Sequence, residues 1–390
     1  MNRNIKNSVI PFCPCILCAY SKFKTQNSKL LSGLFFFLFL SFNISAQEQS
    51  DSIAARKSLF IIPNASYQQE TSWAFGVSGG YYFKSTDLDR ISSISGSAYY
   101  TLLNQFSFNI TPKIFFKGGK YYLYSSLNIQ NSPDFYYGTG NTPRSLEQPY
   151  TSQNISIVLQ PYYAVTRNLL VGGILSFRSE RVKTDDTFEA NKQYIFDNYG
   201  EAGWKPYSVT NIGATVMYDT RDNHFYPYRG IFAKATLELS QAGWLSDYSL
   251  QHVSFDVRQF VPLFNDHVWA WQVYAKGTFG RNGIPFQLLP TIGGRDVVRG
   301  FRAGMYRDNI LFAAQTEYRI PIYKRLKAAT FIGTGDVLST NDYKVDKLKF
   351  AYGAGLRFRL NDARVHFRVD LAKNNYNNKL EFYITATEAF

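Results

Sequence analysis

The stretch RVHFRVDL (residues 364–371) alternates strictly between two kinds of side chain. Its apolar members are Val365, Phe367, Val369 and Leu371, and the residues between them are charged or carry an imidazole ring. Successive side chains of a β-strand point to opposite faces, so this spacing predicts a strand with one apolar and one polar face. A wall with lipid on one side and water on the other would need such a strand. A soluble sandwich would show the same alternation.

Length and number favour the membrane wall. Most of the predicted strands reach the roughly 9–11 residues that a tilted strand needs to cross a bilayer, and their number is even. We therefore predict an all-β fold for residues 58–390, a sixteen-stranded antiparallel transmembrane β-barrel of the outer membrane. The strands are expected near residues 58–66, 71–84, 91–101, 105–118, 119–131, 152–163, 168–181, 209–219, 229–241, 248–262, 267–280, 310–320, 326–336, 348–360, 363–373 and 379–390.

The connections between these strands support the same fold. From the fourth predicted strand onward, the connections that lead from an even-numbered strand to the next odd-numbered strand are mostly short. From the fifth strand onward, the connections that lead from an odd-numbered strand to the next even-numbered strand are mostly long. Short periplasmic turns and long extracellular loops are typical of outer-membrane barrels. The long loops are 132–151, 182–208, 281–309 and 337–347. Loop 281–309 is a candidate functional element, because loops longer than about 12–15 residues are usually functional.

The N-terminal residues predict export. Residues 1–46 read as a cleaved signal peptide, with five basic and no acidic residues, an apolar run over 30–42 and a cleavage site after Ala46. Residues 47–57 are expected to be a short periplasmic tail. Cys13, Cys15 and Cys18 all fall within the predicted signal peptide, so disulfide or thiol chemistry is not expected in the mature chain.

Composition excludes several classes of function. The chain contains 33 Phe, 29 Tyr and 5 Trp, which suits the aromatic girdles of a barrel. The predicted mature chain has 37 basic and 29 acidic residues, and its net charge of +8 is spread along it, whereas a nucleic-acid footprint would be clustered. The spacing of Cys13, Cys15 and Cys18 could bind a metal, but these residues fall in the predicted signal peptide, and we expect no metal or cofactor in the mature chain. The histidines lie far apart and the usual catalytic motifs are missing, so we do not expect an enzyme. They are His224, His252, His267 and His366.

Loop 281–309 carries the sequence GGRDVVRGF (293–301). This motif resembles the one that the BamA/TamA family (bacterial surface antigen superfamily) carries on an extracellular loop folded into the pore. The resemblance implies that the tip arginine touches the inner wall. The matching residues are Gly293, Gly294, Val298, Arg299, Gly300 and Phe301.

The same resemblance implies carboxylate partners for Arg299. Glu317, in QTEYRIPIY (315–323), lies on the polar face of the next strand and matches the family position. In ATFIGTGDV (329–337) the chain has Gly333 where the family has aspartate. Asp336, three residues further on, is expected on the opposite face and is the weaker candidate.

Two other stretches extend the resemblance, which covers residues 209–390. The stretch MYDTRDNHFYPYRGIF (217–232) resembles a periplasmic turn of the family, in which aspartates accept backbone hydrogen bonds and proline and glycine set the shape. An ordinary structured turn is the alternative. The turn residues are Asp219, Arg221, Asp222, Pro227 and Gly230.

The seam between the first and last strands is the remaining candidate site. Pro63 lacks an N–H, so either it weakens the closing ladder or the first strand starts after it. Phe382 is expected on the lipid face of the closing strand. Phe390 ends that strand as an aromatic terminus like those of outer-membrane barrels.

Family members that assemble other barrels carry periplasmic POTRA domains, which we do not expect here because the predicted strands begin soon after the predicted signal peptide. It resembles the short, barrel-only members. The resemblance implies insertion or translocation of proteins or lipids at the outer membrane of a Gram-negative bacterium, through a lateral seam. Expected partners are outer-membrane lipid, client outer-membrane or exported proteins, and a separate periplasmic protein.

A passive diffusion channel is the alternative function. Four arginines near the end of the chain are expected to face the pore, and they would favour anions. They are Arg357, Arg359, Arg364 and Arg368.

Overall fold

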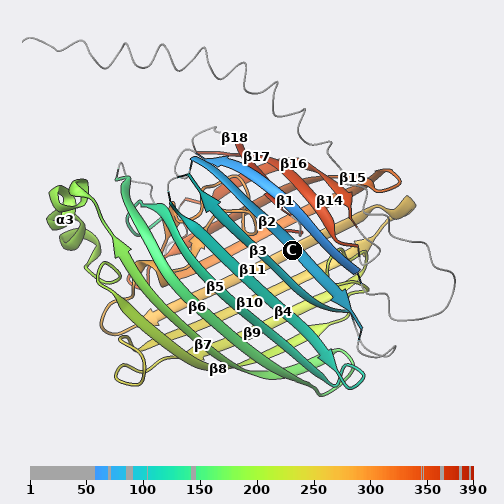
Figure 1. Ribbon diagram of the computed structural model, residues 1–390, viewed down its shortest axis with the longest axis horizontal. Helices are drawn as coiled ribbons and strands as arrows, with labels where there is room; N and C mark the ends of the chain where they lie inside the picture. Colours follow the sequence, from blue (N-terminus) through green and yellow to red (C-terminus); the bar gives the residue numbers. More distant parts are fainter. Residues whose placement is uncertain are drawn as a thin grey trace, which may run out of the picture. The chain divides into compact units, whose positions relative to one another are not determined.

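The computed structural model describes most of the chain (Figure 1). The predicted signal peptide and periplasmic tail lie outside the described residues. The described residues are 58–68, 72–84, 91–102, 104–141, 146–343, 345, 347–360, 364–376, 380–385 and 388–390.

The chain forms a sheet of sixteen antiparallel strands, so the predicted fold class is confirmed. The first eight strands are β1 (Ser58–Gln68), β2 (Ser72–Phe83), β3 (Ser92–Thr101), β4 (Phe106–Phe116), β5 (Tyr121–Tyr136), β6 (Gln148–Ala164), β7 (Leu169–Lys183) and β8 (Tyr207–Asp219). The others are β9 (Gly230–Leu239), β10 (Leu250–Pro262), β11 (Val268–Gly280), β14 (Ile310–Tyr323), β15 (Leu326–Leu338), β16 (Lys349–Arg359), β17 (His366–Asn374) and β18 (Leu380–Thr385).

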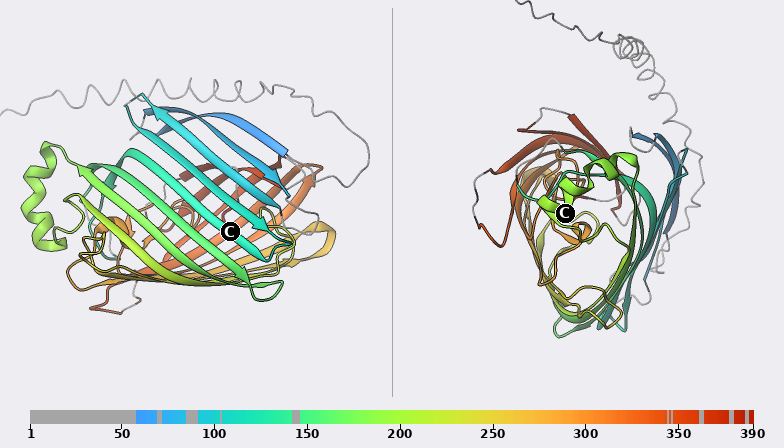
Figure 2. Two further views of the ribbon diagram at one scale, coloured as in Figure 1. Left: turned by 60° about the horizontal axis from the view of Figure 1, so that its bottom comes forward. Right: turned by 90° about the vertical axis from the view of Figure 1, so that its left-hand side faces the viewer.

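Each strand pairs with the next strand of this sheet along the chain, and the sheet curls around an interior (Figure 2). β1 and β18 stand at the two ends of the strand order. Among the described residues, no strand ladder joins them. The seam expected between the first and last strands therefore has two edges whose outer hydrogen-bonding groups are not in a ladder.

The two faces of the wall differ as the alternation predicts. In β14, Gln315, Glu317 and Arg319 are buried on the inner side, whereas Phe312 and Tyr318 lie outward and are partly exposed. Exposed apolar side chains recur around the outer face. Examples are Leu159, Val216, Phe255, Val273, Leu356 and Phe382. This outer surface has the composition of a lipid-facing wall.

The loop between β7 and β8 contains a helix that the sequence pattern does not predict. Helix α3 (Asp186–Tyr199) lies within the predicted loop 182–208. Asp185 caps it by accepting a hydrogen bond from the N–H of Phe188 at 3.2 Å. Only Phe188 and Ile195 of the helix are buried, which explains why its apolar periodicity is weak. No helix in the described parts of the chain is long and apolar enough to cross a membrane.

The last strand is shorter than predicted. We expect a strand over 379–390, but β18 ends at Thr385, and Glu388 and Phe390 lie in the barrel interior. Alternation offers a reason. Continuing the strand would place Glu388 on the lipid face with Phe382, and a carboxylate there is unfavourable. Inside, its Oε2 lies 3.4 Å from Nε of Arg357.

Candidate functional site

Loop 281–309 folds back into the barrel and fills part of its interior. Within it, β12 (Thr291–Ile292) and β13 (Tyr306–Arg307) pair as a small two-stranded sheet. Buried residues of the loop pack against the inner wall formed by β14, β15 and β16. They form one core comprising Ile292, Val298, Phe301, Tyr306, Leu311, Ala313, Val337 and Ala351. The predicted in-folded loop is therefore a packed plug.

Gly300 allows the tip of the plug to approach the wall closely. Its φ is +120°, and a Cβ there would lie 2.9 Å from Cβ of Ala351. Its N–H donates to the hydroxyl of Tyr383 on β18 at 3.0 Å, and its carbonyl accepts from Asn374 on β17 at 2.6 Å. Glycine is needed here because a side chain would push the tip away from these strands.

Val298 adopts a backbone conformation that β-branched residues rarely adopt. Its φ is +53° and its side chain is fully buried. Such strain costs on the order of 1–3 kcal/mol and persists only where the surroundings enforce it. Here the N–H of Val298 donates to Oε1 of Gln315 at 3.3 Å, and the Gln315 amide donates to the carbonyl of Asp296 at 2.8 Å. The surrounding packing and these bonds hold the turn that aims Arg299 at the wall.

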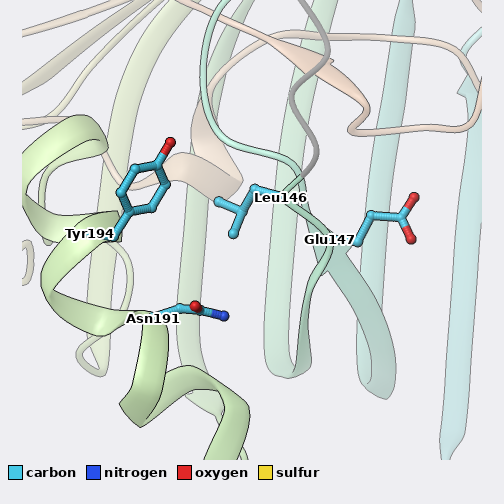
Figure 3. Close-up of a pocket in the computed structure, with 4 residues that line it drawn as sticks. All are labelled: Leu146, Glu147, Asn191 and Tyr194. Atoms are coloured by element: carbon cyan, nitrogen blue, oxygen red, sulfur yellow. The ribbon is translucent and has the colours of Figure 1, made fainter. Parts of the chain in front are cut away.

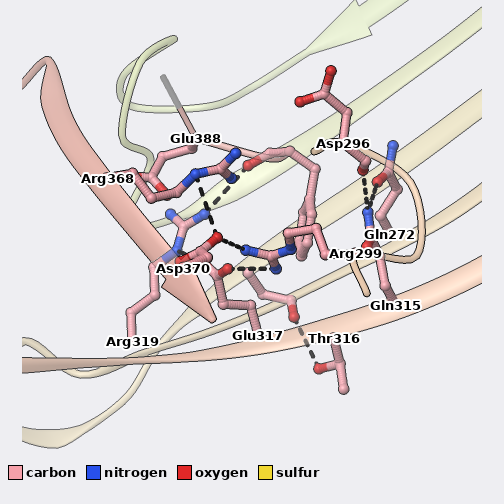
Figure 4. Close-up of polar contacts among 12 residues, drawn as sticks. Gln272, Asp296, Arg299, Gln315, Thr316, Glu317, Arg319, Arg368, Asp370 and Glu388 are labelled. Carbon is pink, nitrogen blue, oxygen red and sulfur yellow. Dashed lines mark hydrogen bonds and ion pairs between the residues drawn. The ribbon is translucent and has the colours of Figure 1, made fainter. Parts of the chain in front are cut away.

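Arg299 is fully buried and binds two carboxylates on different strands (Figure 4). Nη2 donates to Glu317 on β14 at 2.7 Å, and Nη1 donates to Asp370 on β17 at 2.6 Å. Its guanidinium lies 3.6 Å from the ring centroid of Phe331. The expected Arg299–Glu317 pair is thus present, and the tip is held to strands on either side of β15 and β16.

Three more arginines complete this cluster. Arg357 donates to Asp370 at 2.5 Å and to Glu317 at 3.0 Å. Arg319 donates to Glu317 at 2.8 Å, and Arg368 lies 3.4 Å from Asp370. With Glu388, the cluster has four arginines and three carboxylates, all with side chains less than a twentieth exposed. The name arginine cluster is used below for these seven residues.

Asp336 is not a partner of Arg299, and that expectation is wrong. Its carboxylate binds Lys349 at 2.5 Å and accepts from the amide of Asn141 at 3.2 Å. Asp336 lies five residues beyond Phe331 along β15, a rise of about 17 Å at the strand spacing. The second carboxylate is Asp370. Alternation already places Asp370 on the polar face, where it is the only carboxylate of its strand.

The turn after β8 is built as its residues suggest. Asp219 accepts from the N–H of Arg221 at 3.1 Å, and Asp222 accepts from the N–H groups of Tyr228 and Arg229 at 2.9 and 3.1 Å. Gly230 has φ of +112°, and a Cβ there would lie 2.5 Å from the carbonyl oxygen of Thr220. The turn is therefore a rigid element.

Its proline takes part in a further contact, since the carbonyl of Pro227 accepts from Arg319 at 3.2 Å. The turn thus touches the arginine cluster from the end of the barrel opposite α3.

The seam residues fall in three different environments. Pro63 lies inside β1 opposite Val77, so β1 does not start after it. Phe382 is exposed on the outer face of β18, as expected. Phe390, expected at the end of the closing strand, is instead buried against Phe260 and the inner wall.

Other features offer little for chemistry. A hollow of about 400 Å³ beside α3 is lined by Leu146, Glu147, Asn191 and Tyr194 (Figure 3). It is open and has one carboxylate. In the part of the chain that the structure describes, no three His, Cys, Asp or Glu side chains are grouped to hold a metal ion.

Comparison with known proteins agrees with this architecture. Residues 92–390 match the model of the Omp85 superfamily domain. The chain is similar to the structure of BamA from Haemophilus ducreyi lacking POTRA domains 1–3, with a TM-score of 0.55 and 15% identity over 85% of this chain and 69% of that one. It is also similar to CdiB from Acinetobacter baumannii, with a TM-score of 0.52 and 14% identity over 83% of this chain and 57% of that one. These likenesses concern the fold. The family match covers most of the chain, which therefore belongs to the Omp85 superfamily.

Proposed function

We propose that this protein is an outer-membrane barrel that assists the insertion or translocation of proteins, with the edges of β1 and β18 as the surface that meets the client. The resemblance of its loop and turn motifs to the BamA/TamA family supports this role, and so does its membership of the Omp85 superfamily.

The observation that carries the proposal is the seam. β18 has 6 residues and β1 has 11, and no ladder joins them within the described residues. A strand edge that is not part of a ladder can pair with an incoming strand through its N–H and C=O groups. A client β-strand is therefore the ligand for which this edge is suited.

The plug supports the same reading. Arg299 binds Asp370 of β17 and Gly300 binds Tyr383 of β18, so the tip holds the strands next to the seam from inside. These contacts support the β18 edge of the seam from inside, while the plug continues to fill part of the barrel interior. A client would then pass along the wall.

A passive anion channel is less well supported. Arg357 and Arg368, which we expected to line an anion path, are fully buried and paired with carboxylates of the arginine cluster. Arg364 pairs with Asp222 at 2.6 Å. Charges neutralised in this way contribute little field to a water-filled path.

A site-specific photo-crosslinker tests the proposal in living cells. It is placed at Phe382, on the outer face of β18, and in a matched variant at Ile157, on the outer face of β6 away from the seam. We expect outer-membrane or exported proteins to be crosslinked at Phe382 and only lipid at Ile157. Lipid adducts alone at both positions would contradict a client-binding seam.

A further inference from the structure

The turn between β8 and β9 lies across the end of the barrel opposite α3. We call residues 220–229 the strap. The strap contacts strands other than β8 and β9, which it connects. Its side chains reach β2 and β4 in one direction and the β16–β17 region in the other. These two regions flank the seam between β1 and β18.

On the β1 side, the strap packs through aromatic rings. The Phe225 ring meets the edge of the Tyr82 ring with centroids 5.0 Å apart. Tyr82 belongs to β2 and stacks in turn on Phe60 of β1 at 5.8 Å. His224 stacks on Phe115 of β4 at 5.6 Å. The strap therefore packs directly against β2 and β4 and, through Tyr82, is connected to β1.

On the β18 side, the strap makes an ion pair and a ring contact. Asp222 accepts from Arg364 at 2.6 Å, and the Tyr226 ring lies 4.0 Å from the ring of His366 at the start of β17. Val365, which lies between Arg364 and His366 in the sequence, is fully buried in the same apolar cluster as Tyr82. Phe225 of the strap packs against this cluster. This cluster thus joins residues from both flanks of the seam.

The strap is stiff enough to transmit these contacts. Oδ1 of Asn223 accepts from the N–H groups of Phe225 and Tyr226 at 2.8 and 2.9 Å. Asp222 also accepts from two backbone N–H groups of the strap. Side-chain bonds to the backbone of this kind fix a turn in one conformation. Moving one flank of the seam must therefore distort the strap or break its contacts.

We propose that the strap is a latch that ties the two flanks of the seam at this end of the barrel. The seam then opens first at the α3 end and parts at the strap end only when the latch contacts break. This inference concerns the barrel itself and goes beyond the proposed function, because it requires no client.

Distances between spin labels across the seam test the latch. Labels at Leu59 and Ile384, both exposed, report the strap end. Labels at Phe75 and Leu380, also exposed, report the α3 end. The measurement uses purified protein in lipid, with Cys13, Cys15 and Cys18 replaced by serine where they remain. Pulsed electron–electron double resonance then gives the distribution of distances between the two labels at each end.

Two variants break the latch from opposite sides. Phe225→Ala removes the contact with Tyr82, and Arg364→Met removes the ion pair with Asp222. Phe264→Ala is the matched control, because Phe264 lies in the turn between β10 and β11 and is 67% exposed. We expect each latch variant to shift the Leu59–Ile384 distribution to longer and broader distances. The Phe75–Leu380 distribution and the control should keep the parent values.

Several results would overturn the latch. An unchanged Leu59–Ile384 distribution in both latch variants is one. An equal shift at both ends, or the same shift in Phe264→Ala, would mean general loosening. Should Phe225→Ala fail to fold, Arg364→Met carries the test, since its side chain is one-third exposed and its loss is mild. Arg364→Lys, which keeps the charge, should restore much of the parent distribution.

Discussion

Replacing Glu317 with glutamine should destabilise the barrel more than replacing Arg299 with alanine, although Arg299 is the residue at the loop tip. The reason is the charge balance of the arginine cluster. Its four arginines face three carboxylates, an excess of one positive charge. Arg299→Ala removes that excess. Glu317→Gln doubles it.

The contacts set the magnitudes. Glu317 is shared by Arg299, Arg319 and Arg357, so its loss leaves three buried guanidinium groups with a weaker partner. Breaking a buried pair costs about 3–5 kcal/mol, and we expect Glu317→Gln near the upper limit. Arg299→Ala loses two charge-assisted hydrogen bonds but relieves repulsion, for a net cost of about 2–3 kcal/mol. A difference of about 2 kcal/mol is roughly thirtyfold in the unfolding equilibrium constant.

Guanidinium titration of the protein folded in lipid measures both values, with tryptophan fluorescence as the signal. Trp269 and Trp271 on β11 provide reporters close to β14. Glu180→Gln is the matched control, because Glu180 is also buried but pairs with one arginine, Arg178. It should cost less than Glu317→Gln. If Arg299→Ala destabilises the barrel as much as Glu317→Gln or more, the argument from charge balance is refuted.

Three further predictions follow from the same geometry. Gly300→Ala should cost about 2 kcal/mol or more, because the added Cβ meets Ala351 at 2.9 Å and φ is positive; the same titration measures it, and an unchanged midpoint would contradict the close approach. Glu388→Leu should let the tail leave the interior, so that a maleimide reacts faster with Ala389→Cys in that background than in the parent; equal rates would show that Glu388 does not retain the tail. Burial raises the pKa of Asp222, but hydrogen bonds from Arg364 and from the backbone of Arg229 and Tyr228 outweigh it and leave the pKa lowered. The latch should therefore be intact above the ordinary carboxyl pKa of about 3.9 and weaken as the pH falls through the lowered pKa of Asp222 in the folded protein. The Leu59–Ile384 distances, measured from neutral to acidic pH, should show this weakening. A change in these distances between pH 8 and 6 would point to another group.

Much of the fold follows from the sequence because a membrane wall imposes period-two alternation on nearly every strand. That rule is enough to put Glu317 and Asp370 on the inner face. It does not say which inner residues share a level, because the stagger between strands sets the height of each side chain in a barrel. The motif position points to Asp336 as the second carboxylate, but Asp336 lies five residues beyond Phe331, about 17 Å further along β15.

Three other features lie beyond local patterns. Helix α3 is held by packing against residues distant in sequence, including Tyr136 and Phe286, more than by its own apolar stripe. The inward tail depends on the mismatch between Glu388 and the lipid face, together with a wall site for Phe390. The strap is visible in sequence only as a turn, since its function as a bridge depends on partners up to 142 residues away.

Arg319 connects the elements that surround the seam. Its Nε donates to Glu317 at 2.8 Å, its Nη1 to the carbonyl of Pro227 in the strap at 3.2 Å, and its Nη2 to the main-chain oxygen of Phe390 in the tail at 3.2 Å. One buried side chain thus contacts the arginine cluster that anchors the plug, the latch and the tail of the last strand. A buried donor left without its acceptor is costly, so withdrawal of any one of these elements weakens the position of Arg319 for the others. Plug, latch and tail are therefore expected to respond together when the seam opens, because all three depend on the same guanidinium group.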